Sequence, residues 1–316
     1  MTIQDVYEIT PDADGMRKCD SFAVWLGENV VSGPDLVLRS DKESGSIFIG
    51  DDVTLGADVT IHGGVEIGDR AQINTGFVAH AGVDIGDGFR CGLNAVLGED
   101  AEVGEHTEIG NDVTIGNKVV VGDYCWINSL VRLESEVRVE NSVWIGRGAR
   151  VGEYTRVRRY VVLHAWSSVG RTCTVGKGFE VGEWVHLGDN VKLPANSSTR
   201  VLNEQMCEAY VKLAPHHLFY KWVTLERRSP GFGAGEILTY NKGDILEVPE
   251  AEMSDRACAP GLHVLRYGHR PEWHGLCSAD HSFLHLVVKV NSEDICFAGL
   301  PTFDGKLRVK RLEVMT

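Results

Sequence analysis

Three histidines stand at equivalent places in a repeating part of the sequence, namely His62, His80 and His164. An imidazole titrates near neutral pH, so a suitably placed His can act as a general base toward a hydroxyl or amine nucleophile. His62 precedes His80 by three steps of the repeat, and Ala81 rather than an acidic or amide residue follows His80. We take His80 as the candidate catalytic residue; the alternative is that all three are exposed histidines without a role.

A second group of possible ligands lies near the C-terminus. His and Cys are the usual zinc ligands, and this segment contains several of both. It has no closely spaced Cys pair, and its last His lies in a hydrophobic run typical of a strand, so we predict no metal site. The residues concerned are Cys258, His263, His269, His274, Cys277, His281 and His285.

The elements that position the histidines come from a six-residue repeat, which runs without interruption from Ile47 to Asn196 through 25 hexads. The first and third residues are mostly apolar and the second is mostly polar, the pattern of a short strand with one buried face. The fourth residue, most often Gly, is expected to adopt the backbone angles of a tight corner, and polar turn residues follow it. The pattern predicts a prism with three flat faces, in which residues three hexads apart lie above one another.

The repeat resembles the hexapeptide-repeat, left-handed parallel β-helix family. The resemblance implies the left hand, about eight coils and trimers packed side by side. Many members are acyltransferases with a corner His as general base, and residues 77–86 look like the catalytic His segment of the sugar and UDP-sugar acyltransferases. A zinc site like that of the γ-class carbonic anhydrases needs a His pair five residues apart, which no hexad supplies.

Two departures from those acyltransferases lead us to expect a protein that is not an enzyme. Their catalytic His is typically followed by an acidic or amide residue, whereas Ala81 follows His80. Many of them also carry a long loop beside the acyl donor, and no insertion interrupts the hexads here. We therefore expect no cofactor. The alternative is a transferase that uses acyl-CoA or an acyl carrier, with His80 as general base.

Outward residues three hexads apart should form columns on the flat faces of the prism. Trp126, Trp144 and Val162 form an apolar column, which we predict to be the contact between subunits of a homotrimer. Two Arg columns could bind an anion or a carboxylate-rich partner, or could simply be solvated. These columns are Arg132 with Arg150 and Arg138 with Arg156.

Composition limits the partners. The chain has 316 residues, 43% of them hydrophobic, and a net charge of -14, which argues against nucleic-acid binding. No apolar run is long enough to cross a membrane, so no membrane partner is expected. The eight Cys show no disulfide spacing, which indicates a reducing compartment. Residues 47–125 contain 3 basic and 14 acidic residues, whereas residues 126–196 contain 10 basic and 7 acidic residues.

We expect three parts: an irregular N-terminal cap segment (1–46), the left-handed β-helix (47–196) and an α+β domain (197–316). In the last part the pattern predicts one helix and four strands. The helix covers 203–213, and the strands cover 218–226, 237–240, 284–290 and 307–314.

The C-terminal part resembles an uncharacterised domain common in bacteriophage and prophage proteins, with a weaker likeness to ADP-ribosyltransferase folds. The resemblance implies a phage or prophage origin. We therefore expect a non-enzymatic trimeric structural or binding protein, with the β-helix as rigid core and the C-terminal domain attaching to a viral or other protein assembly. Its location would be the host cytoplasm or the virion. The motifs concerned are Tyr240-Asn-Lys-Gly-Asp, Cys258-Ala-Pro-Gly-Leu-His-Val, Leu286-Val-Val-Lys-Val and Lys306-Leu-Arg-Val.

Overall fold

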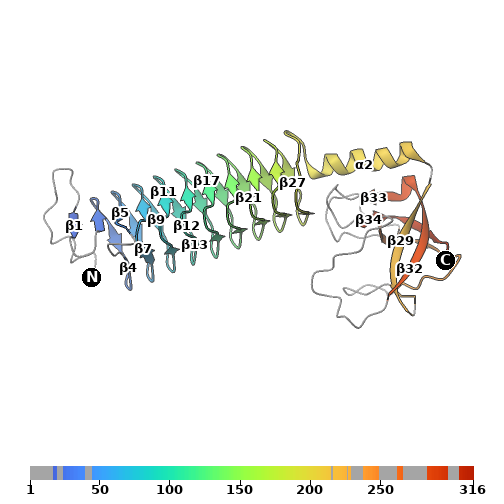
Figure 1. Ribbon diagram of the computed structural model, residues 1–316, viewed down its shortest axis with the longest axis horizontal. Coiled ribbons are helices and arrows are strands. Elements are labelled where there is room, and N and C mark those ends of the chain that lie inside the picture. Colours follow the sequence, from blue (N-terminus) through green and yellow to red (C-terminus); the bar gives the residue numbers. More distant parts are fainter. Residues whose placement is uncertain are drawn as a thin grey trace. The chain divides into compact units, whose positions relative to one another are not determined.

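The computed structural model contains a parallel β-solenoid, followed by helix α2 (Thr199–Leu213) and an antiparallel sheet (Figure 1). These form two compact units, with most of the second unit following Ser198 in the sequence. No helix within the described part of the chain is long and apolar enough to span a membrane. The described residues are 17–19, 24–39, 45–214, 216–225, 227–228, 238–248, 262–265, 283–297 and 306–316.

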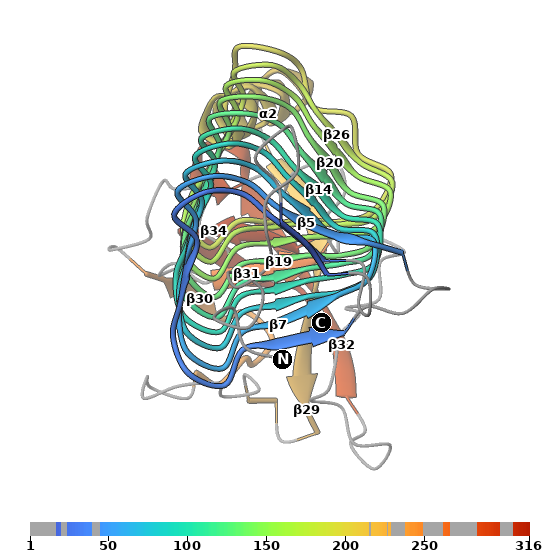
Figure 2. The same cartoon turned by 90° about the vertical axis from the view of Figure 1, so that its left-hand side faces the viewer.

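Each coil of the solenoid contributes one short strand to each of three parallel sheets, so the coils stack into a three-sided prism (Figure 2). We name the sheets face A, face B and face C. Strands three hexads apart pair in register between successive coils, as Val78 does with Val96. This confirms the prism of about eight coils that the hexads predict.

The strands are as follows. Face A contains β2 (Val24–Leu26), β5 (Ile47–Ile49), β8 (Glu66–Ile67), β11 (Asp84–Ile85), β14 (Glu102–Val103), β17 (Val120–Val121), β20 (Arg138–Val139), β23 (Arg156–Val157) and β26 (Thr174–Val175). Face B contains β3 (Val31–Ser32), β6 (Thr54–Leu55), β9 (Gln72–Ile73), β12 (Arg90–Cys91), β15 (Glu108–Ile109), β18 (Trp126–Ile127), β21 (Trp144–Ile145), β24 (Val162–Leu163) and β27 (Glu180–Val181). Face C contains β4 (Val37–Arg39), β7 (Thr60–His62), β10 (Val78–Ala79), β13 (Val96–Leu97), β16 (Thr114–Ile115), β19 (Arg132–Leu133), β22 (Arg150–Val151), β25 (Ser168–Val169) and β28 (His186–Leu187).

The interior is filled by the first and third residues of the hexads. Phe89 is fully buried, and the residues one coil away in its column, Ala71 and Thr107, are small and fully buried too. Alternating large and small side chains keep a narrow interior densely packed. Cys91 and Cys125 are buried as well, and burial raises the pKa of the Cys91 thiol to about 12.

The fourth-position glycines have a different role from the one expected. Positive φ angles occur at the sixth residue of the hexads, as at Arg70 (58°) and Lys118 (56°). A Cβ at Gly104 would lie 2.6 Å from the carbonyl carbon of Gly122 and 2.7 Å from the backbone nitrogen of Asp123. At Gly104 glycine is therefore favoured because successive coils approach closely at this corner. The expectation that it serves the corner's backbone angles is wrong here.

The N-terminal segment is less irregular than expected. Strands β2, β3 and β4 form a coil ahead of the first hexad, and β1 (Arg17–Cys19) pairs antiparallel with β2. The ring of Trp25 stacks on Phe48 with centroids 5.7 Å apart. Because Trp25 pairs in register with Phe48, more than three hexads later in the sequence, this coil does not fit the hexad spacing.

Within the described residues, the second unit contains a seven-stranded antiparallel sheet with the order β30-β35-β32-β29-β31-β34-β33. Its core includes Phe219, Val288 and Leu307. The strand expected at 237–240 is reduced, within the described residues, to a single bridge from Thr239 to Arg228, and the strand expected at 307–314 is two strands. The elements are α2 (Thr199–Leu213), β29 (His216–Thr224), β30 (Ile245–Glu247), β31 (Leu262–Leu265), β32 (Phe283–Asn291), η1 (Ser292–Asp294), β33 (Ile295–Phe297), β34 (Lys306–Val309) and β35 (Arg311–Val314).

Candidate active site

His80 directly follows β10, at the corner where the chain passes from face C to face A. Its backbone N–H donates a hydrogen bond of 3.0 Å to the carbonyl oxygen of Leu97 in the next coil, which fixes the corner. The side chain is half-buried. A rigid backbone with a partly accessible imidazole is a suitable setting for a proton acceptor.

His62 occupies the same corner one coil earlier, at the end of β7. Its ring stacks on that of His80 with centroids 5.4 Å apart and planes inclined by 27°, as a spacing of three hexads leads one to expect. Burial, and then the nearby His80 and Arg39, lower the pKa of His62 below 6.5. His62 is therefore held in its neutral form at neutral pH.

Arg39 extends this histidine column by one coil on the N-terminal side. It ends β4, its Cα pairs in register with His62, and its side chain is exposed. A guanidinium can stabilise an oxyanion or hold a phosphate. Arg39 lies before the first hexad, so the repeat gave no signal for it.

A carboxylate reaches the same corner from the coil that follows His80. A Cβ placed on Gly82 would meet Oδ1 of Asp100, so this carboxylate lies against the turn two residues after His80. Asp100 therefore provides an acidic group at the corner that Ala81 cannot provide. The sequence could have indicated this role, because Asp100 lies three hexads after Gly82 in the same column. A glycine at position 100 would have placed no carboxylate at this corner. Among the described residues, no group of His, Cys, Asp and Glu could hold a metal ion.

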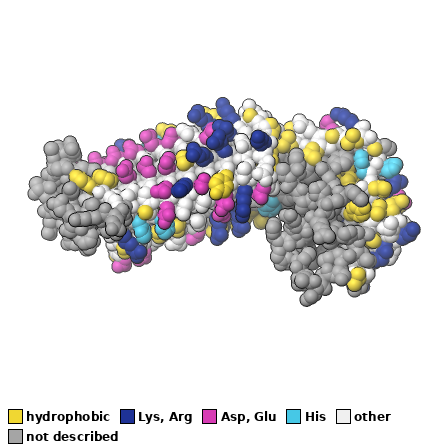
Figure 3. All heavy atoms as spheres, in the orientation of Figure 1, with side chains coloured by type: hydrophobic (Ala, Val, Ile, Leu, Met, Phe, Trp, Pro, Cys, Tyr) yellow, Lys and Arg dark blue, Asp and Glu magenta, His cyan; other side chains and the backbone are white. Residues whose placement is uncertain are grey.

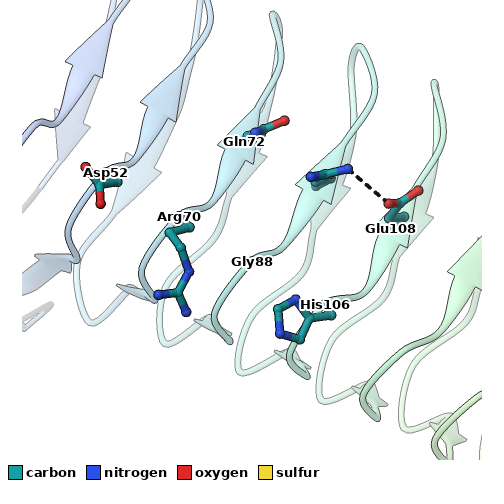
Figure 4. Close-up of a pocket in the computed structure, with 7 residues that line it drawn as sticks. Asp52, Arg70, Gln72, Gly88, His106 and Glu108 are labelled. Atoms are coloured by element: carbon teal, nitrogen blue, oxygen red, sulfur yellow. Dashed lines mark hydrogen bonds and ion pairs between the residues drawn. The ribbon is translucent and has the colours of Figure 1, made fainter.

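A hollow of about 500 Å³ lies at a different corner, between faces A and B. Figure 4 shows its side chains along successive coils, and the dashed line marks the ion pair of 3.5 Å between Arg90 and Glu108. Arg70 forms an ion pair of 3.3 Å with Asp87. The positive charges of both arginines are therefore neutralised within the chain. The hollow does not include His62 or His80. Its lining residues are Asp52, Arg70, Gln72, Gly88, Arg90, His106 and Glu108.

His164, the third corner histidine, lies away from this pair. It follows β24 on face B, and its ring packs against Trp144 with centroids 5.8 Å apart and planes inclined by 63°. The contact is an edge-to-face aromatic pair, which is a packing interaction. The structure thus brings together only two of the three corner histidines.

The predicted surface columns form on the outward sides of the faces. Trp126 is 57% exposed, and Trp144 and Val162 are half-buried beside it on face B. The four arginines are exposed and pair in register, Arg132 with Arg150 on face C and Arg138 with Arg156 on face A. Within the described part of the chain, none of the four forms an ion pair.

Most of the Cys- and His-rich segment lies outside the described residues. This holds for Cys258, His269, His274, Cys277 and His281. His263 lies on β31 and His285 on β32, where it pairs in register with Trp222. The prediction of no zinc site in this segment stays a prediction.

Comparison with known proteins agrees with the repeat. Residues 46–81, which include both His62 and His80, match the family model of the hexapeptide repeat of succinyl-transferases. No curated protein matches the chain. Solved structures also match the part of the chain that contains the solenoid.

Three of these structures illustrate the likeness. The UDP-N-acetylglucosamine O-acyltransferase of Moraxella catarrhalis is 14% identical with a TM-score of 0.46, over 52% of this chain and 69% of that chain. The UDP-N-acetylglucosamine acyltransferase of Bacteroides fragilis is 16% identical with a TM-score of 0.42, over 52% and 68%. A putative acetyltransferase of Bacillus cereus is 16% identical with a TM-score of 0.24, over 54% and 78%.

The expectation of a non-enzymatic structural or binding protein of phage or prophage origin is wrong. The repeat matched at residues 46–81 is that of succinyl-transferases. The structures named above cover about half of the chain, and none of the comparisons supports a phage-like C-terminal domain or a viral assembly.

Proposed function

We propose that the chain is an acyltransferase of the hexapeptide-repeat type, with His80 as general base. The observation that carries this is the stacked pair of His62 and His80, held at one corner within the residues that match the succinyl-transferase repeat. Of the corner histidines, His80 has a carboxylate, that of Asp100, against the turn that follows it. The donor would be an acyl thioester of coenzyme A or of an acyl carrier.

In the proposed reaction, a hydroxyl or amine of the acceptor attacks the thioester carbonyl. A new carbon–oxygen or carbon–nitrogen bond forms, the carbon–sulfur bond breaks, and the thiol leaves. His80 takes the proton of the nucleophile and passes it to the leaving thiolate. His62 stays neutral because its pKa is lowered, so it does not add a positive charge beside the base. The Arg39 guanidinium offers a positive charge for the anionic part of the donor.

We also propose that the protein forms a homotrimer through the column of Trp126, Trp144 and Val162. A 57% exposed Trp beside two further apolar side chains on a flat face favours burial against another subunit.

The test is a transfer assay with succinyl-CoA and acetyl-CoA as donors and sugar nucleotides and amines as acceptors, with product detected by mass spectrometry. His80→Ala should lower the rate by about 10²–10⁴-fold without changing the fold. His106→Ala, at an exposed corner of the same solenoid, is the matched control and should retain the rate. If neither donor binds in calorimetric titration, or if His80→Ala is as active as the wild type, the proposal fails.

A further inference from the structure

The outward residues of face A change charge along the solenoid in an ordered way. After Trp25 and Phe48 on the first two coils, the next three coils carry acidic residues, the following coil an apolar residue, and the two after it basic residues. Figure 3 shows the same trend in the acidic and basic side chains on the surface of the solenoid. The five charged members are exposed and every neighbour pairs in register. The segment of the column that follows Phe48 is Glu66, Asp84, Glu102, Val120, Arg138, Arg156 and Thr174.

This column opposes the stability of a single chain. Like charges directly opposite each other on one face of a sheet repel, and here three acidic residues are neighbours, as are two basic ones. Within the described residues, none of the five charged side chains forms an ion pair. By contrast, Arg90 on face B forms an ion pair with its column neighbour Glu108.

When a second copy of the column runs in the opposite direction, its basic residues lie opposite the acidic residues of the first copy. A two-fold axis parallel to β17 and passing over Val120 would place a second solenoid antiparallel on face A. Glu102 of each copy would then face Arg138 of the other, and Asp84 would face Arg156. The two copies of Val120 would meet at the axis, and Glu66 would face Thr174. Contacts of this kind, in which both partners use the same surface, are the basis of most symmetric dimers.

The corner between faces A and B has the same polarity, with Asp87 three residues after Asp84 and Arg159 three residues after Arg156. Asp87 already forms an ion pair with Arg70, and Arg159 with Glu140, so this corner does not add to the contact. The self-complementary area is therefore the middle of face A, about 29 Å along the axis at about 4.8 Å per coil.

We propose that face A is an interaction surface for a second copy of this chain, docked antiparallel about a two-fold axis at Val120. A parallel arrangement is disfavoured because it would pair each charge with itself. The contact uses a different face from the Trp126 column, and it does not depend on acyl transfer. A monomer that uses this contact becomes a dimer, whereas a trimer, which has three copies of face A, gains contacts with other trimers.

The test uses the full chain and measures mass by analytical ultracentrifugation at low and high salt. Glu102→Arg would place Arg against Arg138, and Arg138→Glu would place Glu against Glu102. Each should raise the dissociation constant of the doubled species by about 100-fold or more. An equimolar mixture of the two variants should regain it, because both contacts then join opposite charges. For the wild type, 1 M salt, with a screening length of about 3 Å, should also dissociate it.

Arg150→Glu is the matched control, since it makes the same charge change at an exposed column position on face C. It should leave the doubled species intact, and circular dichroism should show the solenoid in every variant. A wild type that does not double would overturn the proposal. So would a mixture of the two variants that stays dissociated, or an Arg150→Glu variant that dissociates as readily as Arg138→Glu, since either would point to another surface or partner.

Discussion

The imidazole of His80 stacks on the imidazole of His62 with ring centroids 5.4 Å apart, one coil above the other. Burial lowers the pKa of His62, and the neighbouring His80 and Arg39 lower it further. The corner therefore favours the neutral form of His62.

The lowered pKa of His62 predicts how stability responds to pH. In the unfolded chain this His titrates near 6.5, whereas the folded protein protonates it only at lower pH. The unfolded state thus binds more protons below about pH 6.5, and stability falls as the pH drops through the folded pKa. His62→Asn, a residue already present at the equivalent Asn74, should lose less stability than the wild type between pH 7.5 and 5. Urea denaturation at the two values measures this. His106→Asn should behave like the wild type; equal losses in all three proteins would contradict the prediction.

Phe89→Ala tests the packing of the interior. Phe89 is fully buried between the small residues Ala71 and Thr107, so truncation would leave a cavity that neither neighbour can fill. We expect a loss of about 3–5 kcal/mol in the free energy of unfolding. The exposed Gln72→Ala on face B should change it by less than about 0.5 kcal/mol. A loss under about 1 kcal/mol for Phe89→Ala would mean that the coil closes around the missing ring.

Gly104→Ala tests the close approach of coils at the corners. The new Cβ would lie 2.6–2.7 Å from backbone atoms of Gly122 and Asp123, so the next coil must move. We expect a destabilisation of about 1–3 kcal/mol by thermal or chemical denaturation. Glu105→Ala, the neighbouring exposed residue, should be close to neutral. Equal stability of the two variants would show that the corner accommodates a Cβ at position 104 without strain.

Replacing Trp126 and Trp144 by Glu tests the trimer. An unpaired charge buried at a subunit contact is strongly destabilising, so the double variant should be a monomer by light scattering in 1 M salt, where the face A contact is screened. Thr114→Glu, at an exposed position on face C, should leave the trimer intact. A trimeric double variant would place the subunit contact elsewhere.

The solenoid could be predicted from sequence because the residue pattern within each hexad by itself predicts a short strand followed by a corner. The buried first and third residues, such as Phe77 and Ala79, recur with a fixed period, and stacking follows from that period alone. The coil at Val24–Arg39 was missed because its links to the next coil are longer than three hexads. In the second unit, the helix at 203–213 was placed within a few residues, because its pattern is local.

The sequence predicted the histidines of the candidate site but not the other groups at the same corner. The stacking of His62 and His80 follows from their spacing, so the repeat located it. The approach of Asp100 to the corner depends on the next coil and on the missing side chain of Gly82. Arg39 joins the column through its pairing with His62, at a separation that the repeat does not contain. Contacts between coils thus supplied the groups that the neighbours of His80 in sequence do not.

The strict period of three hexads per coil makes the length of the solenoid quantised. Removing or adding a whole coil keeps every inward residue inward and every column on its own face, whereas any other change rotates the later coils onto different faces. Each whole-coil step would move the histidine corner relative to the Trp126 column by about 4.8 Å. The number of coils therefore sets, in steps of one coil, how far the candidate catalytic corner lies from the surface proposed to join its subunits.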